Sequence, residues 1–357
     1  MKMKHIRLQN KQHRSSNPEK RTGRSFHLTT LLLAGIVICS CASCKNTGNS
    51  TATATDTETA AVGPQFNEDS AWAYCNRQCE FGPRTMNSVA HEQCKDWIVN
   101  KFREYGCEVT EQKADLRGYD GTVLKSTNII ARTSTDNSKP HILLCAHYDS
   151  RPWADNDPDS TNWRKPVIAA NDGASGVAVM LEIARLLQND TTLNVAVDFV
   201  CFDAEDWGAP KWANASGDDS WALGSKYWAK NIGSTADYAY SYGILLDMVG
   251  GEGARFYHEG FSQQYAQNIL DKVWNAARAA GYSSFFPSEG GGYVTDDHVP
   301  LNEIAKIPTI DIIPFYPDCE QSSFGPTWHT VSDDMQHIDK NTLKAVGQTI
   351  IQTLFSE

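Results

Sequence analysis

The chain has 357 residues, of which 41% are hydrophobic and 10% aromatic, and it carries a formal net charge of -11 at pH 7. A hydrophobic fraction of this size excludes an intrinsically disordered protein, and the aromatic content favours pockets lined by rings. The acidic balance argues against a nucleic-acid partner, whose phosphates would be repelled, and suits a partner that carries positive charge.

The first 44 residues are predicted to be an export leader. A long basic stretch is followed by the apolar run 31–38, which is too short to span a bilayer stably. The run ends in small residues and cysteines, a pattern that resembles the site at which bacterial lipoproteins are cleaved and acylated. Cys41 or Cys44 would then become the lipidated first residue, and ordinary cleavage is the alternative. We therefore expect an exported protein, either periplasmic or held at the membrane only through an N-terminal lipid anchor.

Residues 45–65 are rich in Thr, Ala and Ser and are predicted to form a flexible linker, because they cannot bury enough surface to fold. The folded domain is expected to span 66–357. A helix is predicted after Ser88, with Ala90, Cys94, Trp97, Ile98 and Phe102 on one face. Residues 109–132 predict two strands joined by the turn at 118–121.

The centre of the chain alternates between apolar strands and amphipathic helices. Strands are predicted at 142–146, 195–202, 244–246 and 307–313, and helices at 177–187, 221–229, 265–277 and 343–354. Strands that are apolar nearly throughout indicate a sheet that is buried on both faces. The sequence therefore predicts a single α/β domain with a central, mostly parallel, mixed β-sheet flanked by helices on both faces.

Seven of the ten cysteines lie beyond the leader, and their spacings do not resemble a four-thiolate zinc site. Cys145 and Cys201 fall inside apolar strands and are expected to be buried thiols. Four others lie close together in the sequence and could form disulfides in an oxidising compartment. These four are Cys75, Cys79, Cys94 and Cys107.

Polar side chains follow successive predicted strands, where function is expected in such a sheet. They are His147, Asp172, Glu205, Asp206, Asp247, Asp296 and His329. Each has a simple structural explanation by itself: Asp172, for example, could cap the helix that follows it. Adjacent carboxylates at strand ends, however, repel one another and desolvate poorly without a cation. The joint pattern therefore favours a metal site.

Zinc accepts carboxylate oxygen and imidazole nitrogen, and a catalytic site needs three protein ligands with one position left open. Asp172, Asp206 and His329 supply such a set. Glu205, next to a ligand in the sequence, is then placed as a general base near the metal. His147 and Asp247 would complete a second metal site or serve as hydrogen-bonding partners.

From about Ser88 to Phe355, this ordered set of motifs resembles the zinc-dependent exopeptidases of the bacterial aminopeptidase type. The shared pattern comprises a His-x-Asp, an Asn-Asp-Gly loop, an acidic pair, a strand-end Asp and a late His. Two further features resemble glutaminyl cyclases within that family: the segment 296–300, Asp-Asp-His-Val-Pro, and the aromatic segment 324–330 that contains Trp328 and His329. The resemblance implies a zinc-exopeptidase-like fold.

Resemblance to the cyclases implies one zinc ion, held by Asp172, Asp206 and His329, and cyclisation of N-terminal glutamine of peptides or proteins to pyroglutamate with loss of ammonia. Glu205 would move the proton from the α-amine to the leaving ammonia. Asp247 and Asp296 would hydrogen-bond with each other and with the departing nitrogen, one of them being protonated. The substrate pocket would be walled by Trp328 and Phe324.

One departure is Asp206, because animal cyclases have Glu at this position. A second concerns the number of metal ions, since His147, Asp172, Asp206, Asp247 and His329 also form a complete two-zinc aminopeptidase set by residue type. The alternative function is therefore a secreted aminopeptidase in which Glu205 activates a metal-bound water. The doubled acid at 296 and 297 and the Trp beside His329 favour the cyclase. The intact ligand set argues against a non-catalytic binding module.

Overall fold

The computed structural model describes residues 62–357 except 135, 137, 214–219 and 235–238. The predicted leader, 1–44, and the linker as far as residue 61 lie outside these described residues. The last part of the predicted linker packs on the C-terminal helix: the Val62 amide donates to Gln352 Oε1 at 2.8 Å, and Gln348 Nε2 donates to the Pro64 carbonyl at 3.2 Å. The folded part thus includes residues just before the predicted boundary at 66.

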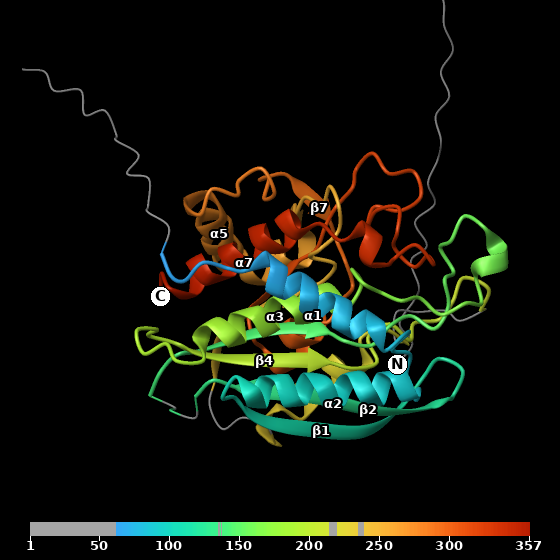
Figure 1. Cartoon of the computed structure of the whole chain (residues 1–357), viewed down its shortest axis with the longest axis horizontal. Coiled ribbons are helices and arrows are strands. Elements are labelled where there is room, and N and C mark those ends of the chain that lie inside the picture. The colour runs from blue at the N-terminus through green and yellow to red at the C-terminus, as the bar shows by residue number, and fades with distance from the viewer. Residues whose placement is uncertain (1–61, 135, 137, 214–219, 235–238) are drawn as a thin grey trace, which may run out of the picture. The chain divides into compact units, whose positions relative to one another are not determined.

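A mixed six-stranded sheet forms the centre of the domain, in the order β1-β2-β4-β3-β5-β8 (Figure 1). Its strands are β1 (Glu108–Arg117), β2 (Val123–Arg132), β3 (His141–His147), β4 (Ala196–Phe202), β5 (Tyr240–Leu246) and β8 (Thr309–Ile312). The pairs β1/β2 and β2/β4 are antiparallel, and β4/β3, β3/β5 and β5/β8 are parallel. The predicted mixed, mostly parallel sheet is confirmed. The strand predicted at 307–313 is shorter, since Pro308 lacks an N–H for the ladder.

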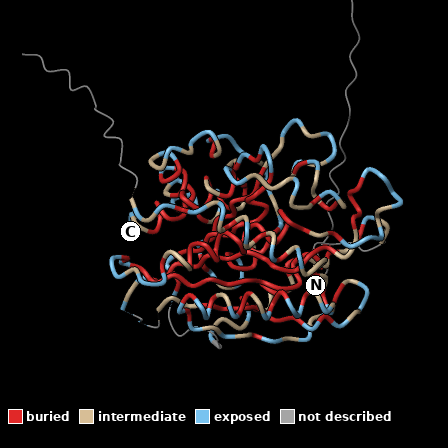
Figure 2. Tube along the Cα trace, in the orientation of Figure 1, coloured by how far each residue is buried: buried red, intermediate tan, exposed pale blue. Residues whose placement is uncertain are grey.

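Helices cover both faces of this sheet, as predicted. In β3, Ile142, Leu144 and Ala146 pack into one core and Leu143 and Cys145 into another. The first core includes side chains from α1 (Glu68–Glu80), α2 (Val89–Glu104), α3 (Ala174–Leu187), α5 (Gly260–Ala279) and α7 (Lys340–Leu354), and the second includes side chains from α4 (Leu223–Lys230) and from the π-helix η4 (Leu301–Ala305). Figure 2 shows the buried strands between these layers.

Shorter elements complete the described chain. They are the 3-10 helices η1 (Ser160–Asn162), η3 (Ile232–Ser234) and η5 (Met335–His337), the short helix α6 (His298–Pro300), and the two-stranded sheet of β6 (His258–Glu259) and β7 (Gly290–Gly292). Over the described residues, the helices are all too short or too polar to cross a membrane.

The cysteines differ in part from expectation. Cys145 and Cys201 are fully buried thiols, as predicted. The disulfides expected among Cys75, Cys79, Cys94 and Cys107 are absent, and the cysteines of the described chain are all free. Packing separates Cys94 and Cys107, which lie in the large core beside the sheet, from Cys75 and Cys79, which lie together in a separate cluster. The Cys75 thiol donates to the Ala170 carbonyl.

Phe66 anchors the start of the domain on α7, and this contact can be tested. Its ring is 2% exposed and lies against Gly347, and its amide donates to Gln348 Oε1 at 2.8 Å. Phe66→Ala is expected to lower the free energy of unfolding by about 3 to 5 kcal/mol through the lost burial and the cavity left behind. Val89→Ala is the control, since Val89 is 72% exposed. Equal urea midpoints for the two variants would contradict the anchoring role.

Candidate metal centre and active site

The polar side chains singled out in the sequence gather at the carboxyl edge of the parallel strands. His147 is the last residue of β3, Glu205 and Asp206 follow β4, and Asp247 follows β5. Asp172 lies just before α3, and His329 lies in the long connection between β8 and α7. This is the edge at which open α/β sheets bind ligands.

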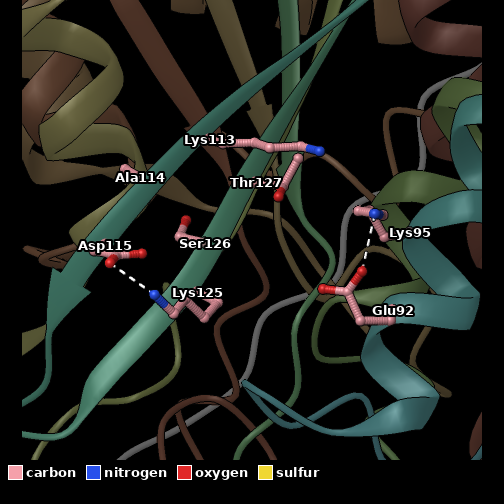
Figure 3. Close-up of a pocket in the computed structure, with 8 residues that line it drawn as sticks. All are labelled: Glu92, Lys95, Lys113, Ala114, Asp115, Lys125, Ser126 and Thr127. Atoms are coloured by element: carbon pink, nitrogen blue, oxygen red, sulfur yellow. Dashed lines mark hydrogen bonds and ion pairs between the residues drawn. The ribbon is translucent and has the colours of Figure 1, made fainter.

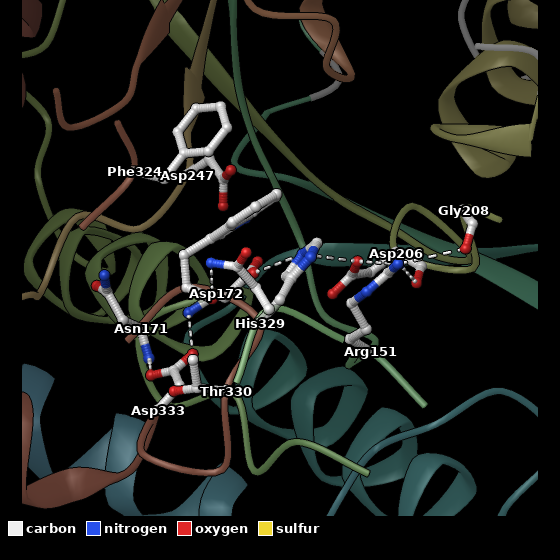
Figure 4. Close-up of polar contacts among 12 residues, drawn as sticks. Arg151, Asn171, Asp172, Asp206, Gly208, Asp247, Phe324, His329, Thr330 and Asp333 are labelled. Carbon is white, nitrogen blue, oxygen red and sulfur yellow. Dashed lines mark hydrogen bonds and ion pairs between the residues drawn. The ribbon is translucent and has the colours of Figure 1, made fainter. Parts of the chain in front are cut away.

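Two groups of side chains at this edge could hold a metal ion, and they share Asp172. In the first group, His329 Nε2 lies 3.2 Å from Asp206 Oδ1 and 3.4 Å from Asp172 Oδ2 (Figure 4). In the second, His147 Nε2 lies 3.0 Å from Asp172 Oδ1 and 3.2 Å from Asp247 Oδ1. The first group is the ligand set predicted from the sequence, and the second is the remainder of the two-metal set.

The chemistry of the first group fits zinc. Asp172 is not the N-cap of α3, because that position is occupied by Gly173, which has no side chain with which to cap the helix. Burial would raise the pKa of Asp172, but hydrogen bonds with His147 and His329 outweigh it and lower the pKa. Asp206 is 1% exposed, and its Oδ2 has no hydrogen-bond partner. Two carboxylates and an imidazole converging in a buried site form the donor set that catalytic zinc accepts.

Glu205 is positioned for proton transfer beside this group. Its backbone N–H donates to Asp149 Oδ1 at 3.1 Å, and its side chain lines the same cavity as Asp172 and His329. Burial raises the pKa of Glu205 well above its ordinary value, with His147 opposing the shift and Asp296 and Asp206 adding to it. A carboxyl group in this position can accept a proton from a bound molecule and return it.

Asp247 and Asp296 line the same cavity but do not hydrogen-bond with each other, which differs from the expectation. Asp247 Oδ1 is held by His147, and Asp296 Oδ1 accepts from the Asp297 amide. Burial and the neighbouring Asp247 raise the pKa of Asp296 to about 7. Its Oδ2 is buried without a partner and so offers a hydrogen-bonding group that the protein itself leaves unused.

The cavity has a volume of about 130 Å³ and aromatic walls. The Trp328 ring stacks on His329 with centroids 3.8 Å apart, and Trp221 stacks parallel to the same imidazole at 5.8 Å. Phe324 packs against Trp328 at 4.9 Å. Trp328 and Phe324, both predicted from the sequence, therefore lie at the cavity, while Trp221 was not predicted.

A larger cavity of about 320 Å³ lies elsewhere, between α2 and the hairpin of β1 and β2 (Figure 3). Its lysines are paired with neighbouring carboxylates: Lys125 lies 2.7 Å from Asp115, and Lys95 lies 2.9 Å from Glu92. Because these charges are already neutralised and the buried ligand groups lie elsewhere, the smaller cavity is the better candidate for catalysis despite its size.

Arg151 and Asp333 support the site, and the sequence analysis did not find them. Arg151 is 1% exposed and makes two 2.8 Å bonds to Asp155. It also donates to the backbone carbonyl and Oδ1 of Asp206 at 3.1 and 3.3 Å. Asp333 accepts from the amides of Asn171 and Asp172 at 2.7 and 3.0 Å. Neither residue carries a clear signal in the sequence, because Arg151 and Asp155 lie in a loop, where the four-residue spacing of helical ion pairs does not apply.

The backbone is strained where it carries these side chains. His329 itself has a φ of 54°, Ala204 beside Glu205 has 53°, and Met248 beside Asp247 has 51°. L-residues rarely adopt this left-handed conformation, and each instance costs of the order of 1 kcal/mol unless its surroundings hold it. The strain marks these loops as sites where function, and not stability, determines the conformation.

Known proteins resemble this chain over the part that carries the site. The model of peptidase family M28 matches residues 128–354. The chain is 30% identical to aminopeptidase YwaD of Bacillus subtilis over 72% of its own length and 50% of that protein. It is 27% identical to the glutaminyl-peptide cyclotransferase of Bos taurus over 63% of its length and 64% of that protein. It thus spans about half to two thirds of the length of these curated relatives.

Among solved structures, the glutaminyl cyclase of Bacteroides thetaiotaomicron bound to N-acetylhistamine is 47% identical, with a TM-score of 0.80. The match covers 83% of this chain and 100% of that one. The fold and the site define a metal-dependent enzyme of the exopeptidase type, and the chain belongs to peptidase family M28.

Glu259 ties the segment that carries Asp296 to the N-terminus of α5. It accepts from the amides of Phe261, Ser262 and Val294, and its Oε2 lies 3.1 Å from His298 Nε2. Burial would raise the pKa of Glu259, but the contact with His298 and the backbone amides outweighs it and lowers the pKa to about 2. The charged carboxylate therefore stabilises the folded protein.

This stabilisation depends on pH in a predictable direction. Since the folded-state pKa of about 2 lies below the ordinary 4.5, the contribution is present above pH 4.5 and is lost as the pH falls towards 2. Glu259→Gln is expected to cost about 3 kcal/mol of unfolding free energy at pH 7, and the gap to the wild type should narrow below pH 4.5. Urea unfolding of both proteins between pH 7 and pH 2 measures this difference in unfolding free energy. Glu289→Gln, at an exposed residue, is the control. A gap independent of pH would contradict the charge-based account.

Proposed function

We propose that this protein is a zinc-dependent glutaminyl cyclase that converts the N-terminal glutamine of peptides or proteins to pyroglutamate with release of ammonia. The observation that carries the proposal is that Asp296 and Trp328 line the same cavity as Glu205 and two members of the ligand group, Asp172 and His329. Asp206 completes that group beside them. A cavity of about 130 Å³ suits one side chain of intermediate size. The 47% identity to a structure named as a glutaminyl cyclase supports the same activity.

Zinc bound by Asp172, Asp206 and His329 would polarise the γ-amide carbonyl of the substrate and stabilise negative charge on its oxygen. The rings of Trp328 and Trp221 both stack on His329, and in the proposed reaction they would help to keep water from this part of the cavity. Excluding water matters, because water would otherwise compete with the α-amine and hydrolyse the amide.

Glu205 moves the proton. It accepts one from the substrate α-amine while the bond between that nitrogen and the γ-carbonyl carbon forms. It then returns the proton to the amide nitrogen as the carbon–nitrogen bond breaks, so ammonia leaves and the enzyme regains its starting state. Asp296, whose Oδ2 has no partner in the protein, and Asp247 accept hydrogen bonds from the departing nitrogen. The raised pKa of Asp296, about 7, keeps part of this pair protonated.

A two-metal aminopeptidase is the second candidate. The specific observation in its favour is the group of His147, Asp172 and Asp247, whose ligand atoms lie within 4.8 Å of one another. The 30% identity to an aminopeptidase points the same way. In that enzyme Glu205 would activate a water for attack on the first peptide bond.

The two candidates are separated by products and by metal content. The mature protein would be incubated with one dipeptide that begins with Gln and another that begins with Leu, and the products followed by mass. The proposal requires loss of ammonia from the first, no cleavage of the second, and about one zinc per chain. Release of free amino acids with about two zincs per chain would establish the aminopeptidase instead.

Glu205→Gln tests the proton transfer directly. We expect kcat on the Gln dipeptide to fall by about 10²-fold or more, because the amide cannot accept the proton. Zinc content should be unchanged, since the side chain of Glu205 is not in the ligand group. Glu108→Gln makes the same change on an exposed residue of β1 and should leave kcat unchanged. Turnover that survives Glu205→Gln would remove this residue from the mechanism.

We further propose that the protein is exported and is either periplasmic or anchored by a lipid on Cys41 or Cys44, with residues 1–44 as leader and the predicted linker, up to the residues that pack on α7, as tether. The basic and apolar leader supports export. The proposed function needs no nucleic-acid partner. Contact with the membrane would occur only through the lipid anchor. Mass spectrometry of the native N-terminus tests acylation, and an unmodified mature end beyond Cys44 would count against it.

A further inference from the structure

A second cavity of about 50 Å³ lies directly beside the candidate catalytic cavity. The two share three wall residues, Val294, Ile313 and Phe324. Phe324 is half-buried, with its ring at 4.9 Å from the ring of Trp328. A molecule seated in the catalytic cavity thus has a neighbouring cavity on the Phe324 side.

The walls of this second cavity are mostly apolar. Tyr257 and Phe315 contact each other edge to face at 5.4 Å, and Pro314 lies beside them. Glu259 is the carboxylate in the wall, and both its oxygens are occupied by backbone amides and by His298. The cavity therefore offers burial to an apolar group, and its carboxylate is already occupied by other partners.

Tyr293 forms part of the rim and is unusually exposed. Its side chain is 69% accessible although it is a large aromatic residue. It is fixed in place, because its ring lies over Gly260, where an added Cβ would approach within 2.7 Å, and contacts Phe261 edge to face at 5.0 Å. An ordered, exposed aromatic ring beside a cavity is typical of a surface that contacts a ligand.

We propose that this second cavity is the subsite for the side chain of the residue that follows the N-terminal glutamine, and that it selects a small apolar side chain such as valine or proline. The inference rests on the proposed function. Consecutive Cα atoms lie about 3.8 Å apart, and the two cavities share three wall residues, so the residue after a glutamine seated in the catalytic cavity lies within reach of the adjoining one. A volume of about 50 Å³ holds about three or four water molecules, which matches a side chain of that size.

The wild-type protein provides the first test. The specificity constant kcat/KM would be measured for Gln-Val-amide, Gln-Gly-amide and Gln-Asp-amide. The subsite predicts values about tenfold higher for valine than for glycine, because one small apolar side chain is buried, and the lowest values for aspartate. Equal specificity constants for Gln-Val-amide and Gln-Gly-amide would overturn the proposal. That result is expected if the peptide runs along the Trp221 side of the catalytic cavity and not towards the second cavity.

Ser323→Leu provides the second test. Ser323 is exposed at the rim of this cavity, and a leucine there would cover it without touching the predicted ligands or Glu205. We expect kcat/KM for Gln-Val-amide to fall about tenfold, to the level of Gln-Gly-amide, while kcat/KM for Gln-Gly-amide stays unchanged. Ser284→Leu, at an exposed serine outside the cavity, is the matched control and should keep the preference for valine.

The outcomes separate the two proposals. Absence of pyroglutamate from all three peptides refutes the proposed function, whereas pyroglutamate with no preference at the second residue refutes the subsite alone. A preference for valine that survives Ser323→Leu also refutes it. If Ser323→Leu also loses activity on Gln-Gly-amide, Tyr293→Ser provides the decisive test. This variant opens the rim of the second cavity and does not fill it. The subsite again requires the preference for valine over glycine to fall.

Discussion

The site depends on one electrostatic constraint, the burial of several carboxylates within a few ångströms of one another. Asp172, Asp206 and Asp247 are each less than 10% exposed, and each lies within 3.4 Å of an imidazole nitrogen. Burial favours the neutral form of each carboxyl group, and mutual repulsion adds to this effect. Two histidines offset only part of the cost, so a cation bound among these groups is the arrangement that best satisfies them.

The surrounding structure holds these groups together before any cation binds. Arg151 places a buried positive charge against Asp206 and fixes its own position through two bonds to Asp155. Asp333 holds the backbone of the loop that carries Asp172, and Asp149 accepts from the amides of both Glu205 and Asp206. Such supporting hydrogen bonds fix ligand orientation and are as necessary to a metal site as the ligands are. The strained backbone of His329 is held separately, because its carbonyl accepts from the Asn156 amide at 3.0 Å.

Much of the fold and of the site could be predicted from the sequence, for physical reasons. The strands β3 and β4 are fully buried, so their side chains are apolar without interruption and give an unambiguous pattern. The ligands follow strand ends, and the topology of parallel strands then brings them to one edge. Asp172 by itself could have been a helix cap. It was predicted as a ligand because Asp206 and His329, at other strand ends, complete a ligand set with it.

Other features depend on contacts that the sequence pattern does not encode. Asp333 meets the amide of Asp172 across 161 positions, and Trp221 reaches His329 across a similarly long separation. The predicted bond between Asp247 and Asp296 is not formed: Asp247 Oδ1 contacts His147, Asp296 Oδ1 accepts from the Asp297 amide, and Asp296 Oδ2 has no partner. The second cavity is formed by side chains from separate segments that meet only in the folded chain. Local periodicity carries no information on such distant contacts.

The most direct test of the central claim is a crystal of the zinc-loaded protein measured with X-rays above and below the zinc absorption edge. The account predicts one strong anomalous peak, bounded by Asp172, Asp206 and His329. A second peak of equal height among His147, Asp172 and Asp247 would contradict the one-zinc cyclase and favour the aminopeptidase. No peak at either group would refute the claim that a cation offsets the buried carboxylates.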